Sequence, residues 1–223
     1  MPSTSLPLTF LGDTEDERFV NGISYGLCAM MFGAFLHLSL GSAAPYGRYS
    51  GTKTYGFPVN GKVAWIVQEF PSLAIPLILY GVGPTEIKDQ LANRILLGLF
   101  VFHYFNRTII FPLKIRGGKP TPFFIMLSAI FFTTVNGYIQ GKQLTAIQAY
   151  QDDHLKSPRF IIGILMFVAG VTINWHSDYI LRNLRKPGET GYKIPCGGLF
   201  EYVSGANYLG EIVEWTGFAV ACG

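Results

Sequence analysis

Three groups of polar residues interrupt long apolar stretches of this chain. Ionisable side chains in such stretches are candidates for function because hydrocarbon cannot solvate them. Glu69 could accept a hydrogen bond from Tyr104 and aim the phenol at a substrate oxygen. Alternatively, Glu69 pairs with Arg107 and holds two helices together, and the sequence leaves both interpretations open. The whole first group comprises Gln68, Glu69, His103, Tyr104, Asn106 and Arg107.

The second group consists of Asn174, Asp178, Arg182 and Arg185, which follow one another at offsets of four, four and three. On a helix these offsets place side chains on one face. Arginine can hold phosphate in bidentate geometry, so this stripe predicts a site for a polar ligand that carries phosphate. The alternative is a helix end with interfacial basic residues and i,i+4 ion pairs.

The third group contains Asn207, Glu211 and Glu214, again on one helical face and next to Trp215. Two carboxylates in an apolar stretch need partners. The nearest basic segment in the sequence is 182–193, so a structural network of salt bridges is an alternative to a binding site.

Several familiar sites are not predicted. The chain has neither GxGxxG nor GxxxxGK[ST], so it lacks the usual Rossmann and P-loop signatures, and neither HExxH nor another metal-ligand spacing occurs. Three cysteines without a CxxC spacing indicate neither a disulfide framework nor a zinc site. A formal net charge of +3, with no strip of alternating basic and aromatic residues, does not favour a nucleic-acid partner.

The elements that must position these residues are membrane helices. Charged residues make up only 14% of the chain and hydrophobic residues 49%, whereas soluble domains have about 25% charged residues. Apolar runs occur at about 19–44, 63–82, 95–113, 121–139 and 160–181, with a partial run from 208. A span needs roughly 20 residues. The sequence therefore predicts an all-α, polytopic integral membrane protein, a helical bundle with five full spans and one partial span in a single domain, 1–223.

The loops predict an orientation in the membrane, because cytosolic loops carry an excess of Lys and Arg. The loops after the first, third and fifth spans hold ten such residues: Arg48, Lys53, Lys62, Lys114, Arg116, Lys119, Arg182, Arg185, Lys186 and Lys193. The opposite side holds six: Arg18, Lys88, Arg94, Lys142, Lys156 and Arg159. We therefore expect a lumenal N-terminus and a cytosolic loop around Lys193.

Five blocks closely resemble the steroid 5-alpha-reductase family, the 3-oxo-5-alpha-steroid 4-dehydrogenases. The first three are WIVQEFPSL (65–73), LLGLFVFHYFNRT (96–108) and NGYIQG (136–141). The strongest are INWHSDYILRNLRKPGETGYKIP (173–195) and GGLFEYVSGANYLGEIVEW (197–215). Tyr46 and the longer N-terminal segment resemble the type 1 enzymes more than type 2.

The resemblance implies a seven-helix enzyme of the endoplasmic reticulum membrane. Such an enzyme uses NADPH to reduce the C4–C5 double bond of 3-oxo-Δ4 steroids, such as testosterone, progesterone and androstenedione, which enter from the bilayer. By motif, Glu69 and Tyr104 would hold the steroid 3-oxo group while hydride is added at C5. Lys193 stands where many members carry Arg, which keeps the charge but loses the bidentate fork. The residues that would contact NADPH are Asn174, Asp178, Arg185, Tyr192, Lys193, Asn207 and Glu211.

Members of the family continue beyond the position that corresponds to Gly223, with the rest of a sixth span, a seventh span and a basic tail. The resemblance thus leads us to expect a truncated chain that is weakly active or inactive. One alternative function is an inactive membrane isoform that pairs with the full-length enzyme. Another is a reductase of a different lipid enone, a polyprenol or an enoyl thioester.

Overall fold

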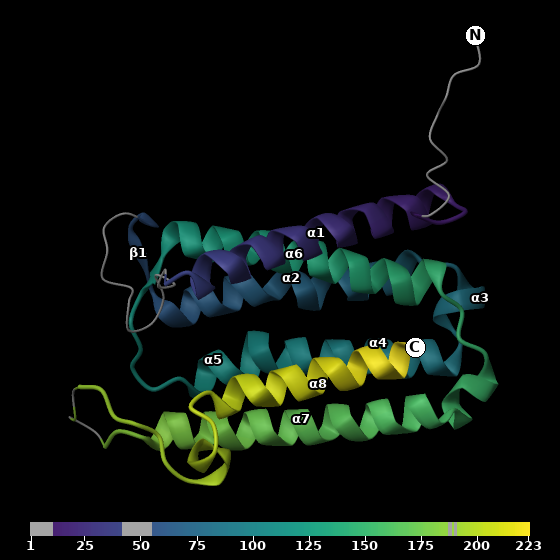
Figure 1. The fold of residues 1–223 in the computed structure, drawn as a ribbon. Helices are drawn as coiled ribbons and strands as arrows, with labels where there is room; N and C mark the ends of the chain where they lie inside the picture. Colours follow the sequence, from purple (N-terminus) through teal and green to yellow (C-terminus); the bar gives the residue numbers. More distant parts are fainter. Residues whose placement is uncertain (1–10, 42–54, 187–188, 190) are drawn as a thin grey trace. The chain divides into compact units, whose positions relative to one another are not determined.

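The computed structural model describes residues 11–41, 55–186, 189 and 191–223. Helices account for most of them, and the only strands among these residues form one short antiparallel pair (Figure 1). The α-helices are α1 (Glu15–Ser39), α2 (Gly61–Val82), α3 (Thr85–Lys88), α4 (Leu91–Phe105), α5 (Phe111–Lys114), α6 (Phe123–Lys142), α7 (Pro158–Asn183) and α8 (Ala206–Cys222). The other elements are β1 (Pro58–Val59), β2 (Thr121–Pro122), π-helices at Asn106–Ile110 and Gln143–Ile147, and 3-10 helices at Asp152–Lys156 and Gly198–Glu201.

Five helical segments in the described part of the chain are long and apolar enough to cross a membrane: Glu15–Ser39, Gly61–Val82, Leu91–Lys114, Phe123–Ile147 and Pro158–Asn183. They confirm the five predicted spans and the all-α polytopic membrane class. The predicted partial span corresponds to α8, which has 17 residues. Tyr46, which supported the resemblance to type 1, and the loop residues Arg48 and Lys53 lie outside the described residues.

The chain forms two compact units. Unit 1 comprises Met1–Leu113 and Gly117–Ala149, and unit 2 comprises Lys114–Arg116 and Tyr150–Gly223. The single domain expected from the sequence stays a prediction.

Local sequence signals set where the helices begin. Thr14 caps α1 by accepting a hydrogen bond from the Glu17 backbone N–H at 3.1 Å, and the Glu17 carboxylate accepts one from the Thr14 N–H at 3.0 Å. This reciprocal capping box satisfies amides that have no partner inside the helix. At the start of α7, Ser157 accepts from the Phe160 N–H at 3.2 Å, and Pro158 takes the first helical position. Proline suits that position because its missing N–H would have no helical partner.

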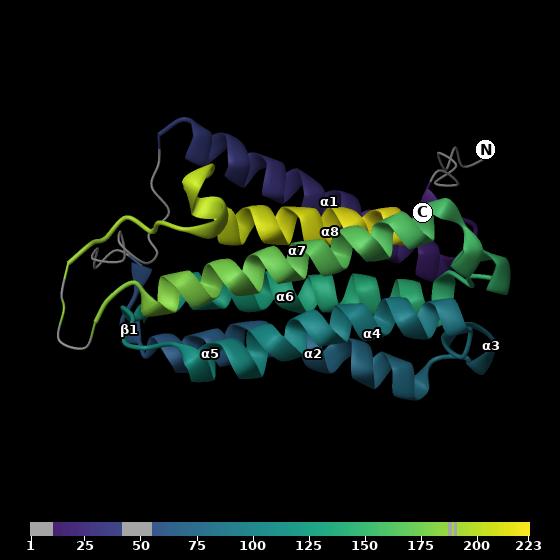
Figure 2. The same ribbon diagram turned by 90° about the horizontal axis from the view of Figure 1, so that it is seen from below.

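In unit 1, α2 packs along α6, and the paired strands β1 and β2 precede these two helices (Figures 1 and 2). Glycines on α6 permit the close approach. A Cβ on Gly137 would lie 3.0 Å from the carbonyl oxygen of Pro71, and one on Gly141 would lie 3.0 Å from the Cα of Pro76. Two glycines four residues apart form one face of a helix, as in the GxxxG packing of membrane helices. Here that face lies on the two prolines inside α2.

Two π-helical turns interrupt unit 1. The first continues directly from α4, and the Phe111 N–H bonds to the Asn106 carbonyl to close it. At the second turn, the buried side-chain amide of Asn93 on α4 donates to two backbone carbonyls. One is that of Leu144 within the turn, at 2.8 Å, and the other is that of Gln148 directly after it, at 2.7 Å. Backbone groups without a helical partner must be satisfied inside the protein when no water is present. π-Helical turns are rare and often occur at functional sites.

In unit 2, α7 and α8 run antiparallel and side by side (Figures 1 and 2). Each helix carries two glycines seven residues apart, Gly163 and Gly170 on α7 and Gly210 and Gly217 on α8. A Cβ on Gly217 would lie 2.5 Å from the Phe167 nitrogen, and one on Gly170 would overlap the backbone of α8. The two backbones are therefore in direct contact, which only glycine permits.

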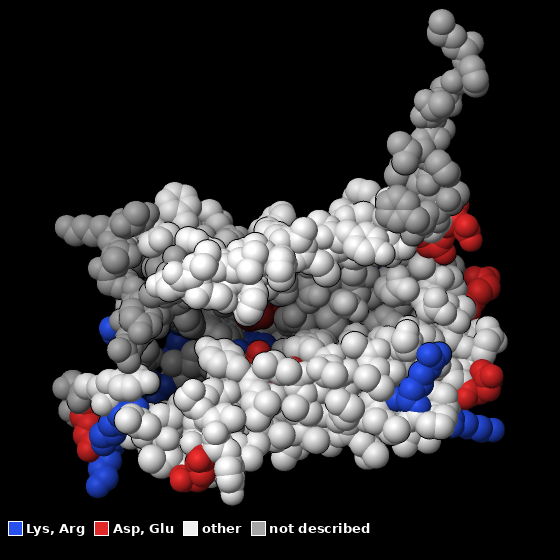
Figure 3. Space-filling view, in the orientation of Figure 1, with Lys and Arg blue, Asp and Glu red and all other residues white. Residues whose placement is uncertain are grey.

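Charged side chains on the face seen in Figure 3 lie mostly toward the ends of the helices, and the middle of the helices there is mainly uncharged. This distribution agrees with membrane-spanning segments, whose central residues face hydrocarbon.

Replacing Gly170 by alanine is expected to destabilise unit 2 by about 1–3 kcal/mol, because the added methyl group forces the backbones of α7 and α8 apart. The measurement is the thermal unfolding midpoint of the purified protein in detergent micelles. Gly98→Ala is the matched control, because a Cβ there meets nothing within 4 Å. If the two variants unfold at the same temperature, the close contact of α7 with α8 is wrong.

Candidate functional site

Tyr104 lies near the end of α4, where its side chain is only 6% exposed. Its ring is 4.7 Å from that of Phe100 and 5.0 Å, edge-on, from that of His103, measured between centroids. Aromatic neighbours at these separations restrict how the ring can turn. The phenol ring is therefore packed among aromatic side chains inside unit 1.

Asn136 of α6 donates a hydrogen bond from Nδ2 to the phenol oxygen of Tyr104 at 2.9 Å. Sequence reasoning placed Asn136 only within the block 136–141 and gave it no role. An amide in the middle of an apolar span was the available signal, because such a group needs a partner within the protein.

The segment of α2 that carries Glu69 is fixed to α6 by two buried hydrogen bonds. The Thr133 hydroxyl donates to the Gln68 carbonyl at 2.6 Å, and the Ser72 hydroxyl donates to the Thr133 carbonyl at 2.8 Å. Pro71 lies between these contacts and has no N–H to donate within the helix. The two hydrogen bonds between Thr133 and the segment from Gln68 to Ser72 set the register of α2 along α6.

The Glu69 carboxylate is half-buried and accepts a hydrogen bond from the Gln68 side chain at 3.4 Å. The Arg107 guanidinium lies over two aromatic rings, 4.8 Å from the centroid of Trp65 and 4.4 Å from that of Phe111. A cation over aromatic faces is stabilised by the charge distribution of the rings. Whether Glu69 orients Tyr104 or pairs with Arg107 stays a prediction.

In unit 2, three of the residues expected at the cofactor come together. Asn174 donates from Nδ2 to the Asn207 carbonyl at 3.0 Å and to Glu211 Oε1 at 3.3 Å. A Cβ on Gly210 would lie 2.5 Å from the Asn174 nitrogen, so this glycine brings the two helices close enough for both bonds. The carboxylate of Glu211 thus has an amide partner on α7.

Two further carboxylates of this region, Asp178 and Glu214, are buried, with 5% and 1% of their surfaces exposed. Asp178 follows Asn174 by one helical turn on α7, and Glu214 follows Glu211 on α8. Buried carboxylates are held by hydrogen bonds or charge. The polar character of both helices therefore continues beyond the Asn174 contacts.

The expected helical stripe from Asn174 to Arg185 is wrong at its last member. α7 ends at Asn183, and Arg185 lies beyond the capping residue Leu184. Its guanidinium turns into the following loop and donates from Nε to the Gly191 carbonyl at 2.7 Å. Arg182 remains on the helix. The offset of three fails because Arg185 is no longer part of α7.

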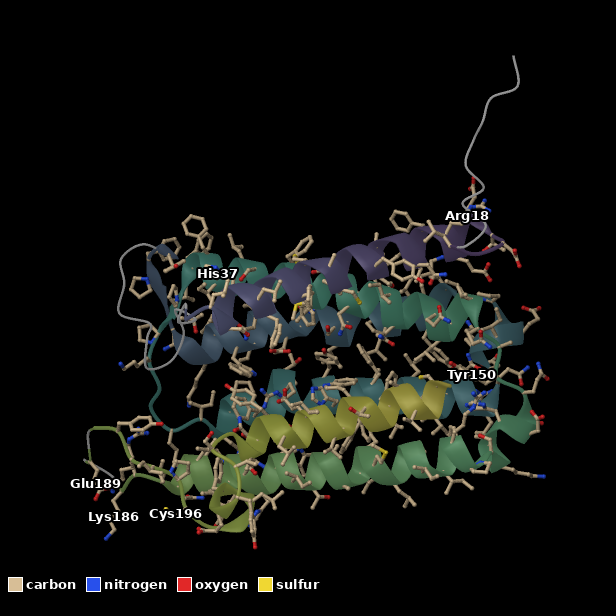
Figure 4. The ribbon with its side chains drawn as sticks, in the orientation of Figure 1. Arg18, His37, Tyr150, Lys186, Glu189 and Cys196 are labelled. Carbon is tan, nitrogen blue, oxygen red and sulfur yellow. The ribbon has the colours of Figure 1, made fainter. Side chains whose placement is uncertain are left out.

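The loop after α7 carries Tyr192 and Lys193, both exposed. The Lys193 ammonium contacts the Glu189 carboxylate, which also accepts the Lys186 backbone N–H at 2.8 Å. Figure 4 shows Lys186 and Glu189 at the same end of unit 2 as Cys196. Exposed cationic side chains therefore lie near one another just after the end of α7.

The loop returns to α7 through the pair Gly197-Gly198. Both glycines have positive φ, 91° and 55°, a conformation that side chains with a Cβ rarely adopt. A Cβ on Gly198 would lie 2.6 Å from Cε1 of the His176 ring. The pair thus permits the sharp turn and the close approach to α7 that precede α8.

Among the residues that the structure describes, no group of three or more His, Cys, Asp or Glu side chains could hold a metal ion. The expected absence of a metal stays a prediction.

The Glu189 contacts should depend on pH. The hydrogen bond from Lys193, followed by that from the Lys186 N–H, lowers the pKa of Glu189 below its ordinary value of 4.5. The contacts are therefore stabilising above that ordinary value and are lost as the pH falls through the lowered pKa. Hydrogen exchange of the Lys186 amide, corrected for its intrinsic rate, should accelerate on acidification. In Glu189→Gln that pH dependence should disappear, and its persistence would contradict the assignment.

Comparison with known proteins shows where this chain belongs. A family model described as 3-oxo-5-alpha-steroid 4-dehydrogenase matches residues 119–223. The chain is 49% identical over 209 residues to 3-oxo-5-alpha-steroid 4-dehydrogenase 1 of Bos taurus, covering 92% of this chain and 80% of the relative. It is 46% identical to the type 1 protein of Homo sapiens, with 92% and 79% covered, and 43% identical to the human type 2 protein, with 83% and 73% covered.

The higher identity to the type 1 proteins agrees with the type 1 character expected from the sequence. The matched region includes the polar residues around Tyr104 and those around Asn174, since it covers most of the chain and the family model begins before α6. By this identity and coverage, the chain belongs to the 3-oxo-5-alpha-steroid 4-dehydrogenase family of oxidoreductases.

Proposed function

We propose that this chain reduces the C4–C5 double bond of 3-oxo-Δ4 steroids, such as testosterone, progesterone and androstenedione, with NADPH as the reductant. Family membership supports the reaction class. The observation that carries the proposal is the buried phenol of Tyr104, a hydrogen-bond donor held by aromatic rings within an apolar span.

The chemistry requires a donor at the steroid 3-oxo group. C5 is electrophilic only because its double bond is conjugated with the C3 carbonyl. When hydride is added at C5, negative charge develops on the 3-oxygen. A hydrogen bond from Tyr104 stabilises that enolate, and it does so strongly because a site that excludes water screens charge weakly. Glu69 is the residue that would orient the phenol, and a proton from water is then added at C4.

The side chains of unit 2 fit a dinucleotide by their chemistry. Exposed cations suit phosphate groups, and the amide and carboxylate groups on α7 and α8 suit hydroxyl and amide groups. The bound cofactor would supply the hydride. The residues that would hold it are Asn174, Asp178, Arg185, Tyr192, Lys193, Asn207 and Glu211. Lys193 would contribute charge without bidentate geometry.

The five apolar helices support a membrane location that suits an apolar substrate. In this proposal the steroid enters from the lipid and NADPH enters from the cytosol. The protein lies in the endoplasmic reticulum membrane, with its N-terminus lumenal and the loop around Lys193 cytosolic, as the distribution of basic residues favours.

Tyr104→Phe tests the catalytic assignment. Removing one donor to a developing oxyanion costs about 10²–10³ in kcat, and the phenylalanine ring keeps the packing. The measurement is conversion of testosterone to dihydrotestosterone in membranes that contain equal amounts of each protein. NADPH affinity serves as the control and should stay unchanged. A variant that keeps full activity would remove Tyr104 from the reaction, and a parent protein that binds NADPH yet forms no product would overturn the proposed function.

Arg185→Gln tests the cofactor assignment separately. Loss of a charge-assisted hydrogen bond to phosphate should weaken NADPH binding by about tenfold or more. The measurement is the Kd of NADPH from fluorescence titration of the purified protein. Arg94→Gln is the matched control, because Arg94 lies in unit 1 and contacts Asp89. Equal Kd values for both variants would contradict the role of Arg185.

A further inference from the structure

Thr108 carries a buried hydroxyl group that the chain leaves unsatisfied. The residue is 0% exposed, and its Oγ1 has no hydrogen-bond partner among the residues that the structure describes. Removing a hydroxyl from water without replacing its hydrogen bonds costs free energy, so buried hydroxyls are normally paired. The exception at Thr108 therefore needs a physical explanation.

The second π-helical turn of unit 1 shows that the local backbone is not the cause. Thr108 is the third residue of Asn106–Ile110, and Thr145 is the third residue of Gln143–Ile147. Thr145 is almost as buried, at 1% exposed, but its hydroxyl donates to the Gly141 carbonyl, four residues earlier, at 2.7 Å. A threonine at this position of a π-turn can thus be satisfied by its own helix, and Thr108 is not.

Threonines inside α-helices often bond to their own backbone in the same way. In unit 2, the Thr172 hydroxyl donates to the Val168 carbonyl at 2.8 Å. A helical threonine divides between two χ1 rotamers because its hydroxyl can reach a carbonyl three or four residues earlier. The carbonyl four residues before Thr108 is that of Tyr104, and Thr108 makes no such bond. Its hydroxyl is therefore open to a partner from outside the chain.

The surroundings of Thr108 restrict the chemistry of that partner. The turn lies within the apolar segment Leu91–Lys114 and packs on α2. The adjacent cation, Arg107, lies over the rings of Trp65 and Phe111. One hydroxyl group does not offset the cost of burying an ion, whereas it forms a full hydrogen bond with a neutral oxygen. The partner that fits is an uncharged oxygen atom.

From these observations we propose that the Thr108 hydroxyl is a binding site for one uncharged oxygen atom, supplied by an ordered water molecule or by the steroid. Water and the carbonyl or hydroxyl group of a steroid share this hydrogen-bonding chemistry. Thr108 follows Tyr104 by four residues, so the site lies one helical turn from the proposed catalytic residue. The steroid as the source rests on the proposed function, and water as the source does not.

Thr108→Val tests the site, because valine keeps the shape of the side chain and removes the hydroxyl. The measurements are the thermal unfolding midpoint in detergent micelles without steroid and the Kd of testosterone. If water is the partner, the midpoint should fall by about 2–4 °C and the Kd should stay within about twofold of the parent. If the steroid is the partner, the Kd should rise by about fivefold or more and the midpoint should not fall.

Thr145→Val is the matched control, since it removes a hydroxyl from the same position of the other π-turn. It breaks a bond within the chain, so it should lower the midpoint and leave the Kd of testosterone unchanged. Thr108→Ser keeps the hydroxyl and should bind testosterone as the parent does.

A crystal structure of the protein with and without testosterone identifies the source of the oxygen. We expect an oxygen of water or of the steroid within about 2.7–3.0 Å of Thr108 Oγ1. A hydroxyl that instead donates to the Tyr104 carbonyl overturns the proposal, as does a Thr108→Val variant with an unchanged or higher midpoint and an unchanged Kd. A parent protein that binds no testosterone overturns the proposed function, while the midpoint and the steroid-free structure still decide whether the site exists.

Discussion

Direct contact between helix backbones at glycine underlies both polar clusters of this protein. In unit 1, Gly137 brings α6 against Pro71 of α2, and the adjacent Asn136 reaches Tyr104. In unit 2, Gly210 brings α8 against Asn174 of α7, whose amide bonds to both Asn207 and Glu211. Lipid offers neither a hydrogen bond nor a hydrophobic drive for helices to associate, so packing and polar contacts must act together.

The membrane helices could be predicted because their signal is local. A span needs a long apolar run, and the polar loop residues on either side mark where the run begins and ends. The position of Asn207 and Glu211 on one face of α8 could also be predicted from the sequence, since both lie on one regular helix. Their meeting with Asn174 depends on a second helix, and the sequence alone did not establish that contact.

Two features escaped sequence reasoning for identifiable reasons. Arg185 continues the spacing of Asn174 and Asp178, but spacing has meaning only while the helix lasts, and α7 ends at Asn183. Asn136 is a single amide on α6 whose partner lies 32 positions away on another helix. No periodicity links two such residues, because their contact is created when α4 and α6 both pack on α2.

The π-helical turn at Asn106–Ile110 affects how this chain can tolerate a change in length. A π-turn accommodates one more residue than an α-turn between hydrogen-bonded partners, and each residue of an α-helix rotates the chain by about 100°. Loss of one residue within this turn could therefore restore a continuous α-helix and keep the contacts on both sides in register. The turn that follows Tyr104 thus holds one residue more than an α-turn, and its loss would leave the phenol in place.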